Sequence, residues 1–377
     1  MKKNIILVIS STIFTFVILY FLIFLKIYFE DFEKERPFLF KSKENLNFHK
    51  NYSEKIHHIR NNYFQYGNPG QPENFLFTSI NDFEDGKKNI LLQGDSWFEQ
   101  ATLQNKSRIK LTSYAKEKNY GLVNAGISSF SPSLMMIQFK ILEKDFNIKP
   151  NIVIAYIDQT DLGDENCRYK KNRVLDNDGN LISIKSESYT RKLYDLVELY
   201  TWSEILLSED TNVVKKLRLT NFSIKFKYIR LVNKIKDISE LGWENRLENR
   251  CFFKKITNYL KKSTNEEKNY FQKQLVNYIN FLEKRTYIDQ IILVTFPHKN
   301  HLISETNKNY YSVNVSNIVD RSIKNKEKIK HLNFSELHQN NKINIDNKFF
   351  EINDPASHLK EEYHTNFFLE KILKNIE

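Results

Sequence analysis

The segment Asn151–Ile157 (NIVIAYI) has no charged residue and is almost wholly apolar. An uninterrupted apolar run of this length predicts a strand buried on both faces, as in a parallel sheet. Further apolar strands are predicted at 89–92, 122–123, 290–296 and 330–334, and helices at 107–118, 132–146 and 359–376. Strands that alternate with helices predict an α/β fold, with a parallel sheet covered by helices on both faces.

The composition is that of a globular protein. The 377 residues are 41% hydrophobic and 27% charged, enough for one large α/β domain with an insertion. The net charge of +11 is spread along the chain without an obvious stripe. Because no nucleic-acid-binding motif accompanies this charge, we expect no nucleic-acid partner.

The N-terminus contains a long uncharged segment. Ile5–Leu25 has 21 residues without a charge, and a helix of this length rises about 31 Å, enough to cross a bilayer. No small-residue cleavage site follows it, so we expect residues 1–29 to be an uncleaved, single-pass membrane anchor. Lys2 and Lys3 favour a cytoplasmic N-terminus and an extracytoplasmic domain. Residues 30–88 are then expected to be a juxtamembrane segment, with a helix near Tyr52–Tyr63.

The remaining residues, 89–377, are predicted to form one domain with a mostly helical insertion at about 168–287. A hairpin is expected at Val174–Ile184, and Ser263–Glu266 has the spacing of a helix-capping box. The insertion could be a structural cap or a lid over a site. The only two cysteines, Cys167 and Cys251, could pair in an oxidising compartment or remain free.

Polar residues follow the predicted strands at the edge where open α/β sheets bind ligands. The first strand leads to Gly94-Asp95-Ser96, the second to Asn124-Ala125-Gly126 and the third to Asp158-Gln159-Thr160-Asp161, while Asp354 and His358 precede the last helix. A nucleophile, a base, an acid that orients the base and oxyanion donors are the parts of a serine hydrolase. Taken alone, Ser96 could equally be a helix N-cap.

These blocks resemble those of the SGNH (GDSL) hydrolase superfamily, over about residues 89–165 and 288–377. The resemblance implies a three-layer, flavodoxin-like sandwich. It implies that Ser96 is the nucleophile, His358 its base and Asp354 the acid that orients the base. It also implies an oxyanion hole made by the N–H groups of Ser96 and Gly126 together with Thr160. No cofactor is implied.

Two positions depart from the family's pattern. Thr160 stands where the family has an asparagine, and its hydroxyl reaches less far than a carboxamide. Asp354 and His358 are four residues apart, where the family spaces them by three, and Pro355 occupies the usual acid position. Both changes leave room for a weakly active or differently specialised enzyme.

The resemblance implies a serine esterase or O-acyltransferase that moves or removes an acyl group, with acetyl expected, on a surface carbohydrate or lipid-linked glycan. The alternative is a non-catalytic SGNH-like protein that binds glycan or acts as a scaffold for a membrane acyltransferase. Both alternatives place the protein at a membrane through its N-terminal helix.

Other polar residues receive more modest interpretations. His298 and His301 follow a predicted strand and could line a substrate loop; without a carboxylate or cysteine beside them, we expect no metal site. The acidic group around Asp161 and Glu165 is expected to be a solvated loop that orients Arg168. The remaining histidines, His49 and His364 among them, are expected at the surface.

Overall fold

The computed structural model describes residues 2–29, 40, 42–53, 55–56, 72–84, 86–184, 191–240, 263–299, 302, 315–352, 354 and 357–376. The chain divides into two compact units. The first, here called the helical unit, comprises Met1–Lys50 and Ser188–Arg246. The second, the sheet unit, comprises Asn51–Glu187 and Leu247–Glu377. Part of the predicted insertion therefore groups with the N-terminal segment, and part with the sheet.

The sheet has six strands in the order β1-β3-β2-β4-β7-β8. Their bounds are β1 Thr78–Asn81, β2 Asn89–Gln93, β3 Gly121–Asn124, β4 Ile152–Tyr156, β7 Gln290–Thr295 and β8 Ile329–Asn333. All neighbours pair in parallel except β1, which runs antiparallel to β3. The predicted α/β class with a mostly parallel sheet is confirmed. The antiparallel strand β1 lies within the stretch expected to be juxtamembrane.

The chain changes direction across the sheet between β2 and β4. After β2 it adds β3 on one side, and then β4, β7 and β8 follow in turn on the other. In open α/β sheets, ligands bind beyond the carboxyl ends of the strands at such a switch point. The segments that follow β2 and β4 carry Ser96 and Asp158, and they therefore meet at this point of the sheet.

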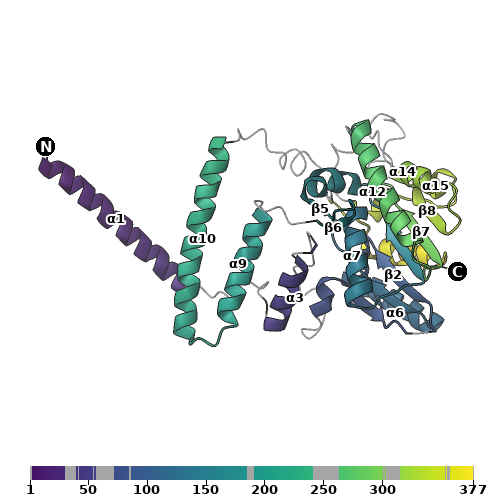
Figure 1. The fold of residues 1–377 in the computed structure, drawn as a ribbon, viewed down its shortest axis with the longest axis horizontal. Coiled ribbons are helices and arrows are strands. Elements are labelled where there is room, and N and C mark those ends of the chain that lie inside the picture. The colour runs from purple at the N-terminus through teal and green to yellow at the C-terminus, as the bar shows by residue number, and fades with distance from the viewer. Residues whose placement is uncertain are drawn as a thin grey trace. The chain divides into compact units, whose positions relative to one another are not determined.

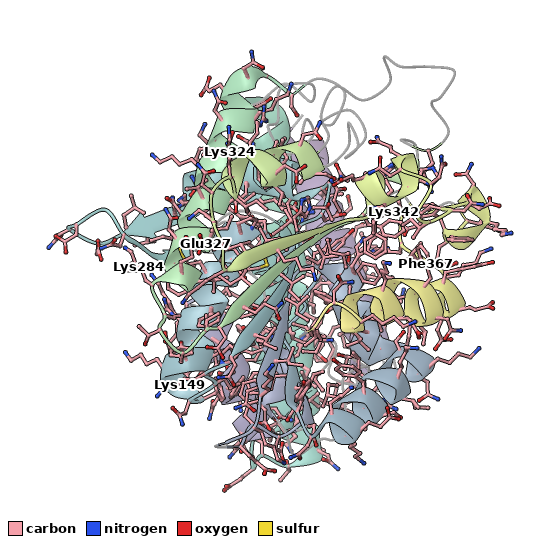
Figure 2. The ribbon with its side chains drawn as sticks, turned by 90° about the vertical axis from the view of Figure 1, so that its right-hand side faces the viewer. Lys149, Lys284, Lys324, Glu327, Lys342 and Phe367 are labelled. Atoms are coloured by element: carbon pink, nitrogen blue, oxygen red, sulfur yellow. The ribbon has the colours of Figure 1, made fainter. Side chains whose placement is uncertain are left out.

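Helices pack on the sheet from both sides. Figure 2 shows the C-terminal helical segment, which carries Phe367, on one side of the strands and α12, which ends just before Lys284, on the other. The described helical segments of the sheet unit are η1 Pro72–Phe75, α5 Ser96–Leu103, α6 Asn105–Lys118, α7 Pro132–Asp145, α8 Asp161–Gly163, η2 Asp164–Tyr169, η3 Lys170–Asn172, α12 Asn265–Glu283, α14 Val315–Ser322, α15 Phe334–Gln339, η6 Asn347–Phe349, α16 Glu361–Tyr363, η7 His364–Leu369 and α17 Glu370–Leu373.

The structure tests the predicted hairpin, the predicted capping box and the helix expected near Tyr52. The predicted hairpin is confirmed as β5 (Arg173–Leu175) paired with β6 (Leu181–Ile184). The capping box of α12 is one residue later than predicted, because Thr264 is the N-cap and Glu267 its partner. The helix expected near Tyr52–Tyr63 is α3 (Lys43–Ser53), which begins earlier; residues 57–71 lie outside the described part.

The helical unit contains α1 (Lys2–Tyr28), α3, α9 (Arg191–Leu206) and α10 (Asn212–Glu240). One segment of α1, Ser10–Tyr28, is long and apolar enough to span a membrane. In Figure 1, α10 stands between α1 and α9, and it packs against both.

Candidate active site

The turn after β2 presents Ser96 at the first position of α5. Gly94 precedes it, and a Cβ at Gly94 would come within 2.9 Å of the Tyr156 Cβ, so a larger residue would displace β4 or the turn. Asp95 is the N-cap of α5, since its side chain accepts a hydrogen bond from the Trp97 N–H at 2.9 Å. Asp95 thus fills the capping role that was the alternative interpretation of Ser96.

Ser96, His358 and Asp354 form a hydrogen-bonded chain. The Ser96 Oγ lies 2.6 Å from the His358 Nε2, and the His358 Nδ1 lies 2.6 Å from the Asp354 Oδ2. A carboxylate can only accept, so the Nδ1 carries the proton and the Nε2 accepts from the serine hydroxyl. The His358 and Asp354 side chains are 16% and 19% exposed, and Ser96 is half-buried, so all three hydrogen-bonded residues are accessible to solvent.

Asp354 and His358, four residues apart in the sequence, are joined by two hydrogen bonds. The Asp354 Oδ2 accepts the backbone N–H of His358 at 2.8 Å as well as its ring N–H, so a single oxygen fixes both the loop and the imidazole. The segment is also held by a bridge between Phe350 and Leu359. Pro355, the residue at the family's usual acid position, lies outside the described residues.

Lys299 fixes the same loop from the end of β7. Its ammonium donates to the Asp354 carbonyl oxygen, and its backbone N–H donates to the Ser357 Oγ at 3.3 Å. Lys299 was not among the predicted site residues. Its position between His298 and His301, directly after a predicted strand, was the available signal. His298 is buried, and His301 lies outside the described residues.

The three predicted oxyanion donors differ in their surroundings. Within the described part of the chain the Ser96 N–H makes no hydrogen bond, as is usual at the first turn of a helix. The Gly126 N–H donates to the Asn124 Oδ1 at 3.0 Å. The Thr160 hydroxyl donates to the Asp158 Oδ2, which also accepts the Thr160 N–H at 3.1 Å. Two of the three donors are therefore engaged in internal bonds.

Gly126 nevertheless lies next to α5, the helix that begins with Ser96. A Cβ at this position would come within 2.5 Å of the Glu99 backbone nitrogen and 2.6 Å of the Phe98 backbone carbon. Asn124 reinforces the approach, because its amide donates to the Phe98 carbonyl oxygen at 2.7 Å. Only glycine permits the β3 turn to come this close to α5.

Three buried carboxyl groups lie behind the site, on Asp95, Asp158 and Asp161. Burial raises the pKa of Asp95 well above its usual range, and the negative charge of Asp158 adds to the shift. Burial likewise raises the pKa of Asp161, with Asp95 and Asp158 contributing. The electrostatic environment below the turns is thus unfavourable to further negative charge.

Asp161 and Glu165 are buried, which corrects the expectation of a solvated loop. Glu165 accepts hydrogen bonds from the Ser131 Oγ and the Ser133 N–H, both at 2.7 Å, and so caps the N-terminus of α7. Arg168 does contact this group, through a bond from its Nε to the Asp164 Oδ1 at 3.0 Å.

His364 is buried beside Trp97, the residue after Ser96, which corrects its expected surface position; His49 is buried as well. The His364 Nε2 lies 2.9 Å from the Trp97 carbonyl oxygen, and its Nδ1 lies 3.0 Å from the Ser107 Oγ. Burial lowers the pKa of His364 to about 4, so the ring is neutral at physiological pH. The Trp97 indole stacks on Tyr156 with ring centroids 4.9 Å apart and forms the aromatic floor below His358.

No described residues form a group of three or more histidine, cysteine or acidic side chains suited to a metal ion. Cys167, whose pairing the sequence left open, is disulfide-bonded, and Cys251 lies outside the described residues. No family model matches the chain, and a search of the curated proteins also finds no match.

Proposed function

We propose that the protein is a serine hydrolase or acyltransferase of the SGNH type. The observation that carries the proposal is the chain of two 2.6 Å contacts from the Ser96 Oγ through His358 to Asp354. The serine begins the helix after the first parallel strand, at the switch point of the sheet, where ligands of open α/β sheets bind. The strand order supports a flavodoxin-like arrangement of the sheet unit.

The proposed reaction begins with attack of the Ser96 Oγ on an acyl carbonyl carbon. The His358 Nε2 takes the hydroxyl proton as the oxygen–carbon bond forms, and the carbonyl electron pair moves to the oxygen. Collapse of this oxyanion breaks the ester C–O bond, and the proton passes from His358 to the departing alcohol. Water, or a sugar hydroxyl in the transferase, then attacks the acyl-enzyme by the same route in reverse.

Each neighbouring group has a definite part in this reaction. Asp354 holds the Nδ1 proton and stabilises the imidazolium that forms during attack. The Ser96 N–H, at the positive end of α5, is the donor at hand for the oxyanion. The Gly126 N–H and the Thr160 hydroxyl can join it only by exchanging their bonds to Asn124 and Asp158 when substrate binds.

The proposed substrate is an acylated surface carbohydrate or lipid-linked glycan, and the protein is proposed to act outside the cytoplasm, held by α1. The resemblance carries the choice of carbohydrate. The apolar segment Ser10–Tyr28 supports the attachment to a membrane, and the disulfide of Cys167 suits an oxidising compartment.

The Gly126 N–H and the Thr160 hydroxyl are bonded to Asn124 and Asp158 and not free for an oxyanion. These internal bonds favour a second candidate, a non-catalytic SGNH-like protein that binds glycan or a membrane acyltransferase. Such a protein would keep the Ser96–His358 contact but would lack a stabilised oxyanion. The two candidates make opposite predictions for an irreversible serine probe.

A fluorophosphonate probe distinguishes them, because its phosphorus reacts only with an activated serine. We expect the full chain to be labelled at Ser96, and Ser96→Ala and His358→Ala to abolish the adduct. Ser79→Ala is the matched control, since Ser79 is exposed and its hydroxyl donates to a carboxylate, that of Asp82, instead of a histidine. A folded chain that stays unlabelled, or one labelled at another serine, would refute the catalytic proposal.

A further inference from the structure

Apolar side chains form an exposed stripe on α10. Val213, Val214, Leu217 and Tyr228 are 59%, 41%, 39% and 67% exposed. At the roughly 100° turn per residue of an α-helix, these four side chains project within an arc of about 100°. These four residues lie on one face of the helix between positions 213 and 228, with the exposed Asn221 between Leu217 and Tyr228, and are here called the α10 stripe.

Basic residues border the α10 stripe on both sides. Arg218 and Lys225 project beside one border, and Lys216 and Lys227 beside the other; all four are exposed. The whole helix carries eight Lys or Arg residues and two acidic ones. A helix that lies in a membrane interface has this pattern, because its apolar side chains enter the acyl boundary while long basic side chains reach the phosphate groups.

The opposite face of α10 is already packed within the helical unit. Leu219 is buried in a cluster with Ile27 of α1 and Ile205 of α9. The Trp202 Nε1 donates to the Ser223 Oγ at 3.1 Å. Because this packing occupies the face toward α9, the α10 stripe lies on the side of the helix that these two helices leave open.

The α10 stripe begins beside the end of the apolar segment of α1. The Lys216 ammonium lies 5.7 Å from the centre of the Tyr28 ring, and Tyr28 is the last residue of that segment. A helix that crosses a bilayer reaches the headgroup region at such an end, where tyrosine and lysine are enriched. The start of α10 is therefore level with the headgroups if α1 spans the membrane.

We propose that the α10 stripe lies in the headgroup region of a membrane that contains anionic phospholipid. The apolar residues enter the interface, and the bordering lysines bind lipid phosphates, while Arg218 is ion-paired with Asp210. The proposal rests on the membrane span of α1 and not on the hydrolase activity. The helical unit is then held at the bilayer by a spanning helix and a second, surface-lying helix.

A fluorescent probe at the stripe tests the proposal in the full chain. Leu217→Cys, labelled with an environment-sensitive dye without reductant, is reconstituted in vesicles of phosphatidylcholine with or without phosphatidylglycerol. Asn47→Cys is the control, because Asn47 is exposed on α3. The parent chain, treated in parallel, gives the background from its own cysteines. The stripe variant should shift to the blue and be quenched by spin-labelled lipid, and the control should not.

A second measurement tests the lysines that border the α10 stripe. Anionic lipid should favour the docked helix by roughly fivefold for each lysine near the surface. Lys216→Gln, Lys225→Gln and Lys227→Gln together should therefore remove most of the dependence of quenching on phosphatidylglycerol.

Three results would overturn the proposal. One is a Leu217 probe that stays in water while the chain resists alkaline carbonate extraction, since the anchor would then hold without the stripe. Another is release of the chain by carbonate, which removes the anchor itself. The last is a shielded probe that spin-labelled lipid does not quench, which would assign the stripe to a second copy or another protein. None of these results depends on labelling of Ser96.

Discussion

Replacing Asp354 by asparagine is the most informative change at the candidate site. One oxygen of this carboxylate accepts both the backbone N–H and the ring N–H of His358, at 2.8 and 2.6 Å. With its oxygen in the place of Oδ2, an asparagine can still accept both N–H groups, and the ring keeps its tautomer. The neutral amide, however, no longer stabilises the imidazolium that forms when His358 takes the serine proton.

The size of the effect follows from these contacts. A hydrogen bond to a charged group contributes about 1.5–3 kcal/mol, and this one strengthens as the imidazolium forms. The corresponding change in a serine protease, which fixes the wrong tautomer, lowers kcat by about 10⁴. That value is an upper bound here, because asparagine can keep the tautomer of His358. Loss of about 1.5–3 kcal/mol lowers kcat by about 10–10², and this is the loss we expect for Asp354→Asn.

The assay is the rate of hydrolysis of a small activated ester, together with the rate of fluorophosphonate labelling. Asp178→Asn is the matched control, because Asp178 is exposed in the β5–β6 hairpin turn. Both variants should melt close to the parent. An Asp354→Asn chain that turns over and labels as fast as the parent would refute the assignment of Asp354.

Three other changes test separate parts of the structure. If Thr160 is an oxyanion donor, Thr160→Val should lower kcat by about 10²–10³ with little change in KM; an unchanged kcat with a lower melting temperature would limit Thr160 to holding Asp158. Burial lowers the pKa of His364 from 6.5 in the unfolded chain to about 4, so the neutral ring favours folding above pH 6.5, and that contribution, about 3 kcal/mol, is lost as the pH falls to 4. His364→Gln should flatten this part of the stability profile measured by urea unfolding, and His338→Gln, at a half-buried position, should not. Finally, the full chain should stay in the membrane pellet after carbonate extraction while a chain that begins at residue 30 should not, and protease added to spheroplasts should digest the large domain; a shorter soluble form would indicate a cleaved signal peptide.

The parallel strands could be predicted because their own residues carry the signal. The apolar run of β4 and its neighbours in the sheet reports burial on both faces directly. β1 was missed because it is short and partly polar (TSIN), and its place at the sheet edge depends on pairing with β3. The grouping of α9 and α10 with α1 was also beyond the sequence, since it arises from tertiary contacts such as that of Ile27 with Leu219.

In the candidate site, too, some features could be predicted from the sequence and others depend on tertiary contacts. Ser96, Asp354 and His358 were found from their positions after strands and before a helix, and His358 lies within hydrogen-bonding distance of both Ser96 and Asp354. The burial of Glu165 could not be predicted, because it depends on the serines of α7. The role of Lys299 was likewise hidden, since its partner is a backbone carbonyl oxygen far along the chain.

The separation of Ser96 from His358 by 262 positions determines when the candidate site can form during synthesis and folding. During synthesis Ser96 emerges early, when the segment that carries His358, its hydrogen-bond partner, has yet to be made. His358 arrives only when residues 357–376 have packed against the rest of the sheet unit, where His364 and Phe368 lie against Trp97. In the proposed mechanism Ser96 therefore becomes reactive only on completion of folding, and a nascent chain has no activated serine to react with its surroundings.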